Sequence, residues 1–174
     1  MEIGTLARIR VLVSDVDGVM TDGTIVVGEG GETKGFNVRD GLGIKLLQRA
    51  GLEFAILSGR SSEPVRQRSR DLGIRIVKVG RIDKETAFWE IARELGVQPE
   101  EMAYIGDDII DIAPLTLAAA GFCPKDAVPE VIAIADHVLS VPGGGGAVRQ
   151  VAEMILKAQG HWSKIVASFG VKRD

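Results

Sequence analysis

The chain has 174 residues, of which 45% are hydrophobic and 26% are charged, and its formal net charge is −3. This length and composition fit one globular domain with its own hydrophobic core over residues 1–174. The charge argues against a nucleic-acid partner, because the sequence contains no basic cluster that would form a binding face.

Short apolar runs alternate with helical patterns along the chain. Each strong run ends in small or polar residues and is followed by a helical pattern, which is typical of a parallel sheet covered by helices on both faces. The strong strand candidates are residues 9–13, 53–57, 75–79 and 102–105, and the weaker candidates are 121–123 and 137–139.

Capping residues mark the expected helices. Gly51, Gly73 and Gly96 each stand where a helix would end, and Pro64 fits the first turn of a helix capped by Ser61 or Ser62. The expected helices are 42–50, 62–72, 84–95, 108–120, 128–135 and 147–158, with Pro114 expected to shorten or kink the fourth of these.

One segment interrupts this alternation. Residues 24–38 read as two short strands around a glycine-rich turn, so we expect a β-hairpin that projects over the top of the sheet. The fold prediction is therefore α/β: a doubly wound, mostly parallel, Rossmann-like sheet with a short β-hairpin insertion, no large cap domain and a C-terminal tail at 160–174. In such sheets ligands bind at the carboxyl ends of the strands.

The compartment can also be inferred. Cys123 is the single cysteine, so no internal disulfide is possible, which suits a reducing cytoplasm. Residues 1–9 lack the apolar core of a signal peptide, and no apolar run approaches the roughly 20 residues that a membrane span needs. We therefore expect a cytoplasmic protein with no membrane partner.

Two carboxylates follow the first strand, at Asp15 and Asp17. Acidic groups just beyond a buried strand are costly unless something neutralises them, and a divalent cation would do so through oxygen ligands. The alternative interpretation is a simple turn, in which Asp and Gly are common. A turn alone would not need the second acid so close to an apolar strand.

The next two strand ends carry weaker signals. Ser58 could donate a hydrogen bond to a phosphoryl oxygen beside helical N–H groups, although a serine at this place is more often only a cap. Lys84 opposes the helix dipole at the start of its helix, and a nearby phosphate or carboxylate would explain it.

The fourth strand end carries three acids, Asp107, Asp108 and Asp111. One helix cap needs one aspartate, and three acids repel each other without a cation. Together with the earlier positions they are expected to lie at one edge of the sheet, which predicts a single site.

In this order the motifs resemble those of the haloacid dehalogenase superfamily of phosphatases. The narrower resemblance is to the 3-deoxy-D-manno-octulosonate 8-phosphate phosphatase family, and it covers nearly the whole chain. It rests on residues 15–23, 36–41, 58–60 and 143–149.

The resemblance implies a phosphatase with Mg²⁺ as its cofactor. Asp15 would attack phosphorus and become an aspartyl-phosphate, while Asp17 would act first as an acid and then as a base. Mg²⁺ would be held by Asp15, by the backbone carbonyl of Asp17 and by Asp107. Asp108 and Asp111 would lie behind these ligands and act through water.

The resemblance also implies how the substrate is held. Ser58, Gly59 and Lys84 would bind the phosphoryl oxygens, since positioning and electrostatics carry most of the rate of such transfers. Arg60 and Thr21 would face a phosphorylated sugar acid, most closely 3-deoxy-D-manno-octulosonate 8-phosphate in the pathway to lipopolysaccharide.

A homotetramer is implied as well, with the hairpins paired around a central axis and a neighbouring subunit closing the site. The hairpin alone is too short to cover the site, so something else must exclude water.

Two features depart from the family pattern. Gly145 stands where the family often carries an arginine, and the tail at 160–174, which in relatives can enter a neighbouring site, does not clearly match.

Three alternatives remain open at this point. The substrate could be a nine-carbon ulosonate 9-phosphate, which the sequence does not separate from the eight-carbon compound. The chain could be a catalytically silent oligomerisation module, although such a module has no need of Asp15, Asp17, Lys84 and Asp107 together. A phosphate-sensing receiver domain also carries an aspartate, an acidic pair and a lysine, but it has no need of Asp17.

Overall fold

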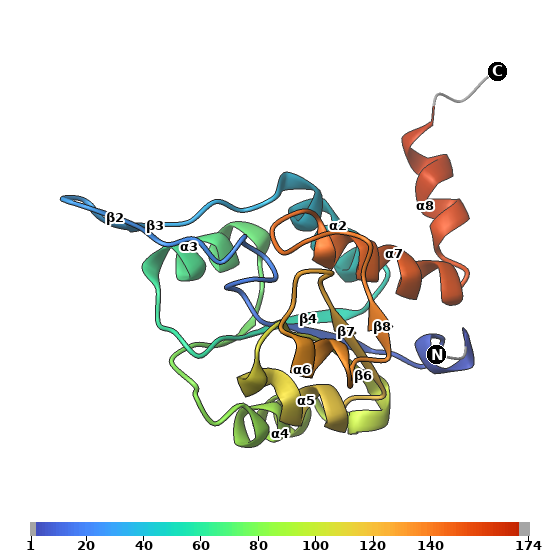
Figure 1. Cartoon of the computed structure of the whole chain (residues 1–174). Coiled ribbons are helices and arrows are strands. Elements are labelled where there is room, and N and C mark those ends of the chain that lie inside the picture. The colour runs from blue at the N-terminus through green and yellow to red at the C-terminus, as the bar shows by residue number, and fades with distance from the viewer. Residues whose placement is uncertain (1–2, 171–174) are drawn as a thin grey trace.

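The computed structural model describes residues 3–170, and it shows helices on both faces of a parallel sheet (Figure 1). The sheet has six strands in the order β5-β4-β1-β6-β7-β8, and every pairing in it is parallel. The strands are β1 Val11–Ser14, β4 Glu53–Leu57, β5 Ile76–Lys78, β6 Met102–Ile105, β7 Ala120–Cys123 and β8 His137–Val138. The prediction of a doubly wound α/β fold is confirmed.

This strand order fixes where a ligand can bind. The chain runs outward from β1 through β4 to β5, and then returns to β6 on the other side of β1. The direction of winding therefore reverses beside β1, and a crevice opens at the carboxyl ends of the strands at such a reversal. Residues that follow β1, β4 and β6 meet there.

The helices are α1 Ile3–Leu6, α2 Val38–Arg49, α3 Glu63–Leu72, α4 Lys84–Leu95, α5 Ile112–Leu117, α6 Pro129–Ile132, α7 Ala147–Ala158 and α8 Trp162–Phe169, with 3-10 turns η1 Pro99–Glu101 and η2 Ile109–Asp111. Helices α3, α4 and α7 agree with the sequence prediction to within a residue at each end, whereas α2, α5 and α6 differ from it. The start of α2 lies before the predicted one because the side chain of Asn37 accepts the N–H of Arg39 and caps the helix there.

The predicted helix over 108–120 was wrong in its extent. The segment is divided into η2 and a short α5 that ends at Leu117, because Ala120 already pairs with Ala103 as the first residue of β7. The helix predicted over 128–135 shortens to α6. The start of the tail, which carried no helix prediction, forms α8. Residues 171–174 of that tail lie outside the described residues.

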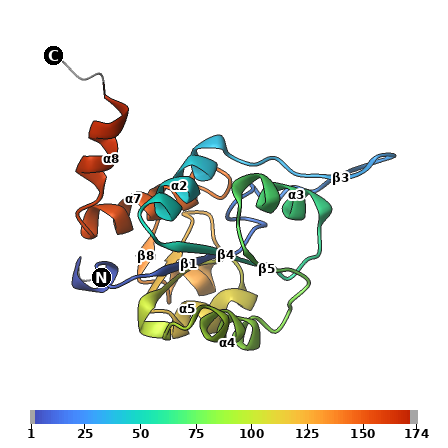
Figure 2. The same cartoon turned by 180° about the vertical axis from the view of Figure 1, so that it is seen from behind.

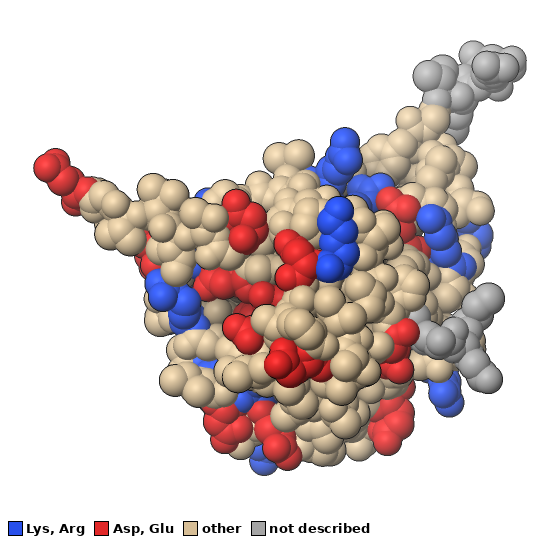
Figure 3. Space-filling model, in the orientation of Figure 1, with Lys and Arg blue, Asp and Glu red and all other residues tan. Residues whose placement is uncertain are grey.

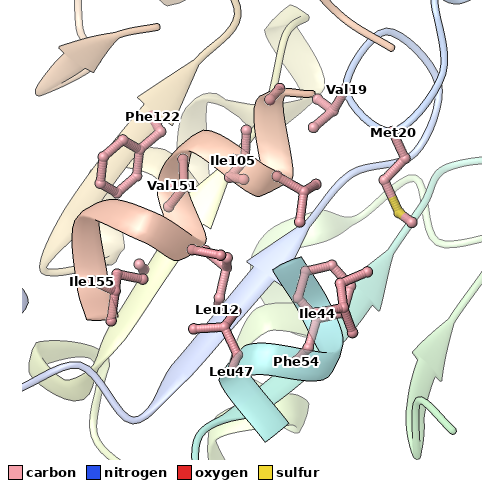
Figure 4. Packing of buried hydrophobic residues seen from close by; sticks show 14 of the residues in the cluster. Leu12, Val19, Met20, Ile44, Leu47, Phe54, Ile105, Phe122, Val151 and Ile155 are labelled. Carbon is pink, nitrogen blue, oxygen red and sulfur yellow. The ribbon is translucent and has the colours of Figure 1, made fainter. Parts of the chain in front are cut away.

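Two hydrophobic layers sandwich the sheet. Helices α2, α3 and α7 cover one face, and α4, α5 and α6 cover the other (Figures 1 and 2). Alternate residues of β1 enter the two layers: Leu12 packs toward α2 and α7, while Val11 and Val13 pack toward α4. Figure 4 shows the first layer, in which Leu47 lies beside Leu12 and Val151 lies beside Phe122. Each such buried aliphatic side chain contributes about 1.5–3 kcal/mol.

The predicted hairpin is present and stands away from this body. It consists of β2 Val26–Gly28 and β3 Gly31–Thr33, which pair antiparallel and form a two-stranded sheet of their own. Figures 1 and 2 show it projecting beyond α3 on the side opposite α8. Val26 and Val27 are exposed on it. Within residues 3–170, no helix has the length and apolar character that a membrane crossing requires.

Candidate active site

A cleft of about 250 Å³ opens at the carboxyl ends of β1, β4 and β6. It brings together most of the residues that the sequence pointed to, and acidic side chains gather on this face near the base of the hairpin (Figure 3). The lining residues are Asp15, Asp17, Gly18, Gly23, Ser58, Gly59, Arg60, Asp107, Asp108 and Ile110.

Asp15 lies at the floor of the cleft, one residue beyond β1, and is only 5% exposed. The N–H of Val16 donates to its Oδ1 at 2.7 Å, and Lys84 Nζ lies 2.8 Å from its Oδ2. Burial, opposed by the charge of Lys84 and assisted by the charge of Asp111, raises the pKa of the Asp15 carboxyl to about 7. The position of the carboxylate is therefore fixed, but Lys84 does not fully compensate the cost of burying its negative charge.

Lys84 begins α4 and points inward rather than toward solvent. Its Nζ contacts Asp15 and also donates to Asp111 Oδ1 at 2.6 Å, and the residue is 2% exposed. Burial alone would lower the pKa of the Lys84 ammonium, but the two carboxylates outweigh it, so the pKa is raised. The unfavourable placement of a lysine at a helix start thus has its reason in these two partners.

Asp111 is fully buried and satisfied by protein donors. Its Oδ1 accepts from Lys84 and from the hydroxyl of Tyr104, and its Oδ2 accepts the backbone N–H groups of Asp107 and Asp108 at 3.2 and 3.3 Å. Burial raises the pKa of Tyr104 well above its ordinary value, which keeps the hydroxyl a donor. Sequence reasoning missed Tyr104, because an aromatic residue within an apolar strand gives only the signal of a core residue.

Asp107 is the group with unmet bonding capacity. Among the described residues, no donor reaches its buried Oδ1. Burial, together with the charges of Asp15 and Asp111, raises the pKa of the Asp107 carboxyl to about 8. Asp15, Asp107 and Asp111 each offer an oxygen atom, and these atoms lie within 4.8 Å of one another.

This donor set fits a hard divalent cation. A buried carboxylate oxygen with no partner is costly, and Mg²⁺ takes oxygen ligands, commonly one or two carboxylates. Gly18 makes the arrangement possible: it adopts φ +82°, and a Cβ atom at that position would overlap Asp107 Oδ2. Two of the expected magnesium ligands, Asp15 and Asp107, therefore have carboxylate oxygens close enough to share a cation.

Asp17 stands at the rim of the cleft, half-buried, and is met by the hairpin. The ammonium of Lys34 contacts its Oδ1, and Arg60 Nε lies 3.7 Å from its Oδ2. Lys34 carried no signal in the sequence, because it follows a strand that looked like an isolated insertion. The structure brings it to the site through the path of the hairpin.

The residues that follow β4 form another wall of the cleft. Ser58 is buried, and its hydroxyl accepts the N–H of Arg60 at 3.3 Å. A Cβ at Gly59 would lie 3.3 Å from Ile110 Cδ1, so a side chain there would narrow the cleft. Asp108 is exposed, and its carboxylate accepts the N–H of Ile109 at the start of η2.

Thr21, like Lys84 and Asp111, is a predicted site residue that does not line the cleft. It is fully buried, and its hydroxyl closes the turn after β1 by donating to Val16 O and accepting from Gly23 N. The loop of glycines at residues 143–146 packs behind this turn. A Cβ at Gly143 would overlap Gly18 O, and Gly144 N donates to Val19 O at 2.9 Å. Gly145 itself is exposed.

The fold and this constellation define a class of enzyme, the haloacid dehalogenase-like hydrolases, whose family model matches residues 74–149. Individual relatives narrow the class. The 3-deoxy-D-manno-octulosonate 8-phosphate phosphatase KdsC of Haemophilus influenzae is 46% identical over 156 residues, which cover 89% of this chain and 87% of that protein. The chain therefore belongs to the 3-deoxy-D-manno-octulosonate 8-phosphate phosphatase family, and it is a phosphatase.

Two solved structures agree with this assignment. The 3-deoxy-D-manno-octulosonate 8-phosphate phosphatase of Moraxella catarrhalis, in complex with a magnesium ion, a phosphate ion and a KDO molecule, is 38% identical with a TM-score of 0.94, covering 97% of each chain. The cobalt-bound form of the Haemophilus influenzae deoxy-D-mannose-octulosonate 8-phosphate phosphatase is 45% identical with a TM-score of 0.87, covering 90% of this chain and 92% of that one. The family resemblance drawn from the sequence motifs is confirmed.

Proposed function

We propose that this chain is a Mg²⁺-dependent phosphatase that hydrolyses 3-deoxy-D-manno-octulosonate 8-phosphate to the free sugar acid and phosphate. The observation that carries the proposal is the buried Asp15 carboxylate, held by Lys84 beside the partnerless oxygen of Asp107. The names of the relatives supply the substrate. We place the reaction in the cytoplasm, in the synthesis of lipopolysaccharide.

In the first step, an oxygen of Asp15 forms a bond to phosphorus as the bond from phosphorus to the sugar oxygen breaks. Asp17 gives its proton to the leaving sugar oxygen. Ser58, the Gly59 backbone and Lys84 would hold the phosphoryl oxygens. Arg60 stands at the rim, where it can meet the sugar acid.

In the second step, water attacks the phosphorus of the aspartyl-phosphate while Asp17 takes a proton from that water. The bond between phosphorus and Asp15 breaks, which releases phosphate and restores the carboxylate. Bound Mg²⁺ supplies positive charge beside the carboxylates and the phosphoryl group. Asp15, Asp107 and the backbone carbonyl of Asp17 would hold it, and Asp111 would orient the Asp107 loop through the N–H groups that it accepts.

We also propose that the active assembly is a homotetramer built through the hairpin. The hairpin projects from the body with Val26 and Val27 exposed, which is costly for a free two-stranded sheet and is explained by a covering copy. The cleft is open above, so a neighbouring subunit would also serve to exclude water from the reaction.

The deciding experiment measures phosphate release from 3-deoxy-D-manno-octulosonate 8-phosphate with Mg²⁺ and with EDTA. Wild type is expected to need Mg²⁺, and Asp15→Asn is expected to lose about 10⁴-fold or more in kcat while keeping the fold, because the amide cannot attack phosphorus. Asp71→Asn makes the same chemical change on the exposed face of α3 and is the matched control.

Each other outcome has a definite meaning. Mg²⁺-dependent release from a nine-carbon ulosonate 9-phosphate or another phosphosugar alone would keep the mechanism and discard the proposed substrate. No release from a broad panel of phosphate esters would favour the silent oligomerisation module. Activity that survives Asp15→Asn would overturn the nucleophile.

A further inference from the structure

Lys34 occupies an unusual environment for a lysine beside an exposed hairpin. It follows the last residue of β3, yet its side chain has no exposed surface. Its ammonium contacts Asp17 Oδ1 and lies 3.3 Å from Glu32 Oε1. A fully buried ammonium is stable only when carboxylates surround it, so Lys34 is held by these two groups.

Glu32 connects this pair to the loop after β4. Its Oε2 accepts from Arg60 Nη2 at 2.9 Å, and its Oε1 accepts from the hydroxyl of Ser62 at 2.8 Å. Ser62 is the N-cap residue of α3, but its side chain makes no capping hydrogen bond. The hydroxyl is directed to the hairpin instead, so the base of the hairpin is fixed to the wall of the cleft.

This network treats the two oxygens of Asp17 differently. Lys34 engages Oδ1, whereas within residues 3–170 the one ion-pair contact of Oδ2 is the longer one, 3.7 Å to Arg60 Nε. The orientation of the carboxylate is therefore set by the hairpin, and Oδ2 is the oxygen that is left for proton exchange with a substrate in the cleft.

We propose that Lys34, itself fixed by Glu32, is a positioning residue for Asp17: it holds Oδ1 so that Oδ2 exchanges the proton with the leaving sugar oxygen. The inference rests on the proposed acid role of Asp17. Proton transfer by a positioned side chain is worth about 10²–10⁴-fold in rate, and a misplacement of about 1 Å can cost about 10²-fold. The hairpin thus contributes to catalysis within its own chain.

The test compares two leaving groups in the first step alone. A sugar alkoxide needs a proton in order to leave, whereas p-nitrophenolate leaves without one. Single-turnover release is measured for 3-deoxy-D-manno-octulosonate 8-phosphate and for p-nitrophenyl phosphate with Mg²⁺. For Lys34→Met, the ratio of the sugar rate to the nitrophenyl rate is expected to fall at least about tenfold, with KM for the sugar phosphate changed less than about threefold.

Three further variants separate positioning from stability. Lys34→Arg is expected to restore most of the ratio because it keeps the charge, and Glu32→Gln is expected to lower the ratio by a smaller factor. Lys45→Met is the control: Lys45 also joins two elements, but it does so by donating to Leu72 O at 2.6 Å, whereas Lys34 contacts Asp17. It should keep the wild-type ratio.

A Lys34→Met enzyme whose two rates fall by the same factor, or whose ratio stays at the wild-type value, would overturn the proposal. If that variant does not fold by circular dichroism, Lys34→Arg and Glu32→Gln decide by the same ratio. Wild type that releases nitrophenolate but not the sugar acid would defeat the proposed substrate alone. The ratio would then be read with another alkyl phosphate that wild type hydrolyses.

Discussion

Gly18 lies where the metal site and the turn after β1 meet. Its φ of +82° belongs to the left-handed region, which is costly for residues with a Cβ atom, and Asp107 occupies the space of the missing side chain. From the other side, the backbone of Gly18 is approached by Gly143. Two glycines distant in sequence therefore let the turn after β1 pack tightly against the loop at Gly143 on one side and the Asp107 side chain on the other.

Gly18→Ala is expected to weaken Mg²⁺ binding, because the added methyl group displaces the Asp107 carboxylate. Disturbing the groups that orient a metal site costs about 10–100-fold in metal affinity, so the Mg²⁺ concentration for half-maximal activity should rise by a similar factor. Titration of activity with Mg²⁺ measures it. Gly4→Ala, where no atom lies within 4 Å of the added methyl group, is the control, and equal Mg²⁺ dependence in the two variants would contradict the prediction.

The packing of α2 against α7 shows how two helices share one interface. Gly43 on α2 faces α7 so closely that a Cβ would lie 3.1 Å from Arg149 Cα and 3.4 Å from Ala152 Cβ. Helix propensity alone favours alanine over glycine by about 1 kcal/mol. The interface opposes this, because an extra methyl group in a well-packed contact costs about 1–3 kcal/mol, and Arg149 Cα belongs to a backbone that cannot move freely.

Gly43→Ala is therefore expected to lower the free energy of unfolding, by about 1 kcal/mol after the two contributions are combined. Urea denaturation followed by circular dichroism measures it. Gly4→Ala on α1 serves here too, because its methyl group meets nothing and should not destabilise the fold. A Gly43→Ala protein as stable as wild type, or more stable, would show that α7 can shift.

Asp40 joins the same two helices by electrostatics. Its Oδ1 accepts the N–H of Arg149 at 2.7 Å in the first turn of α7, and among the described residues no donor reaches its Oδ2. Burial raises the pKa of the Asp40 carboxyl to about 6, although the N–H of Arg149 and the charges of Arg68 and Arg149 lower it. The folded protein thus disfavours the charged form of this carboxyl.

A pH dependence of stability follows from this. The folded pKa is about 6 and the ordinary value is 3.8, so between these values the folded state binds the proton more tightly. Asp40 therefore stabilises the fold less as pH rises from about 4 to about 6, and its contribution levels off above that range. We expect the free energy of unfolding of Asp40→Asn to rise relative to that of wild type across this window, by up to ~3 kcal/mol. Urea unfolding at several pH values measures it, and a constant difference between the two proteins would contradict it.

The whole molecule carries two projections on opposite sides, the hairpin and α8 (Figures 1 and 2). Trp162 anchors the base of α8, where Arg149 and Lys157 lie over its ring at 5.3 Å. Val166 and Phe169 further along α8 are 52% and 61% exposed. The hairpin has no comparable apolar anchor at its tip, so burial of its valines requires another chain.

Val27→Asp is expected to dissociate the proposed tetramer, because a charge at the centre of the paired hairpins would lose its hydration. Light scattering at micromolar concentration measures the mass, which should fall below that of wild type. Val38→Asp is the matched control, since Val38 is 80% exposed and Val27 is 76% exposed, but Val38 begins α2 outside the hairpin. Wild type that runs as a monomer would defeat the tetramer itself.

The sequence by itself determined what depends on local patterns. Continuous apolar runs marked the buried strands, glycines marked helix ends such as Gly73 and Gly96, and the acids after β1 and β6 marked the edge of the sheet where a cation would be needed. These features are readable because periodicity and capping act over a few residues. The order of the motifs then indicated the superfamily.

Only the tertiary structure decided which groups meet. Lys34 reaches Asp17, Tyr104 donates to Asp111, and Asp40 caps α7, and none of these pairings has a local sequence signal. The length of the helix after Asp108 also depended on the tertiary structure, because the pairing of β7 with β6 competes with helix formation. A pattern in the sequence tells which face a residue occupies, whereas its partner depends on how distant elements pack, and that packing sets the charges and the close contacts of the site.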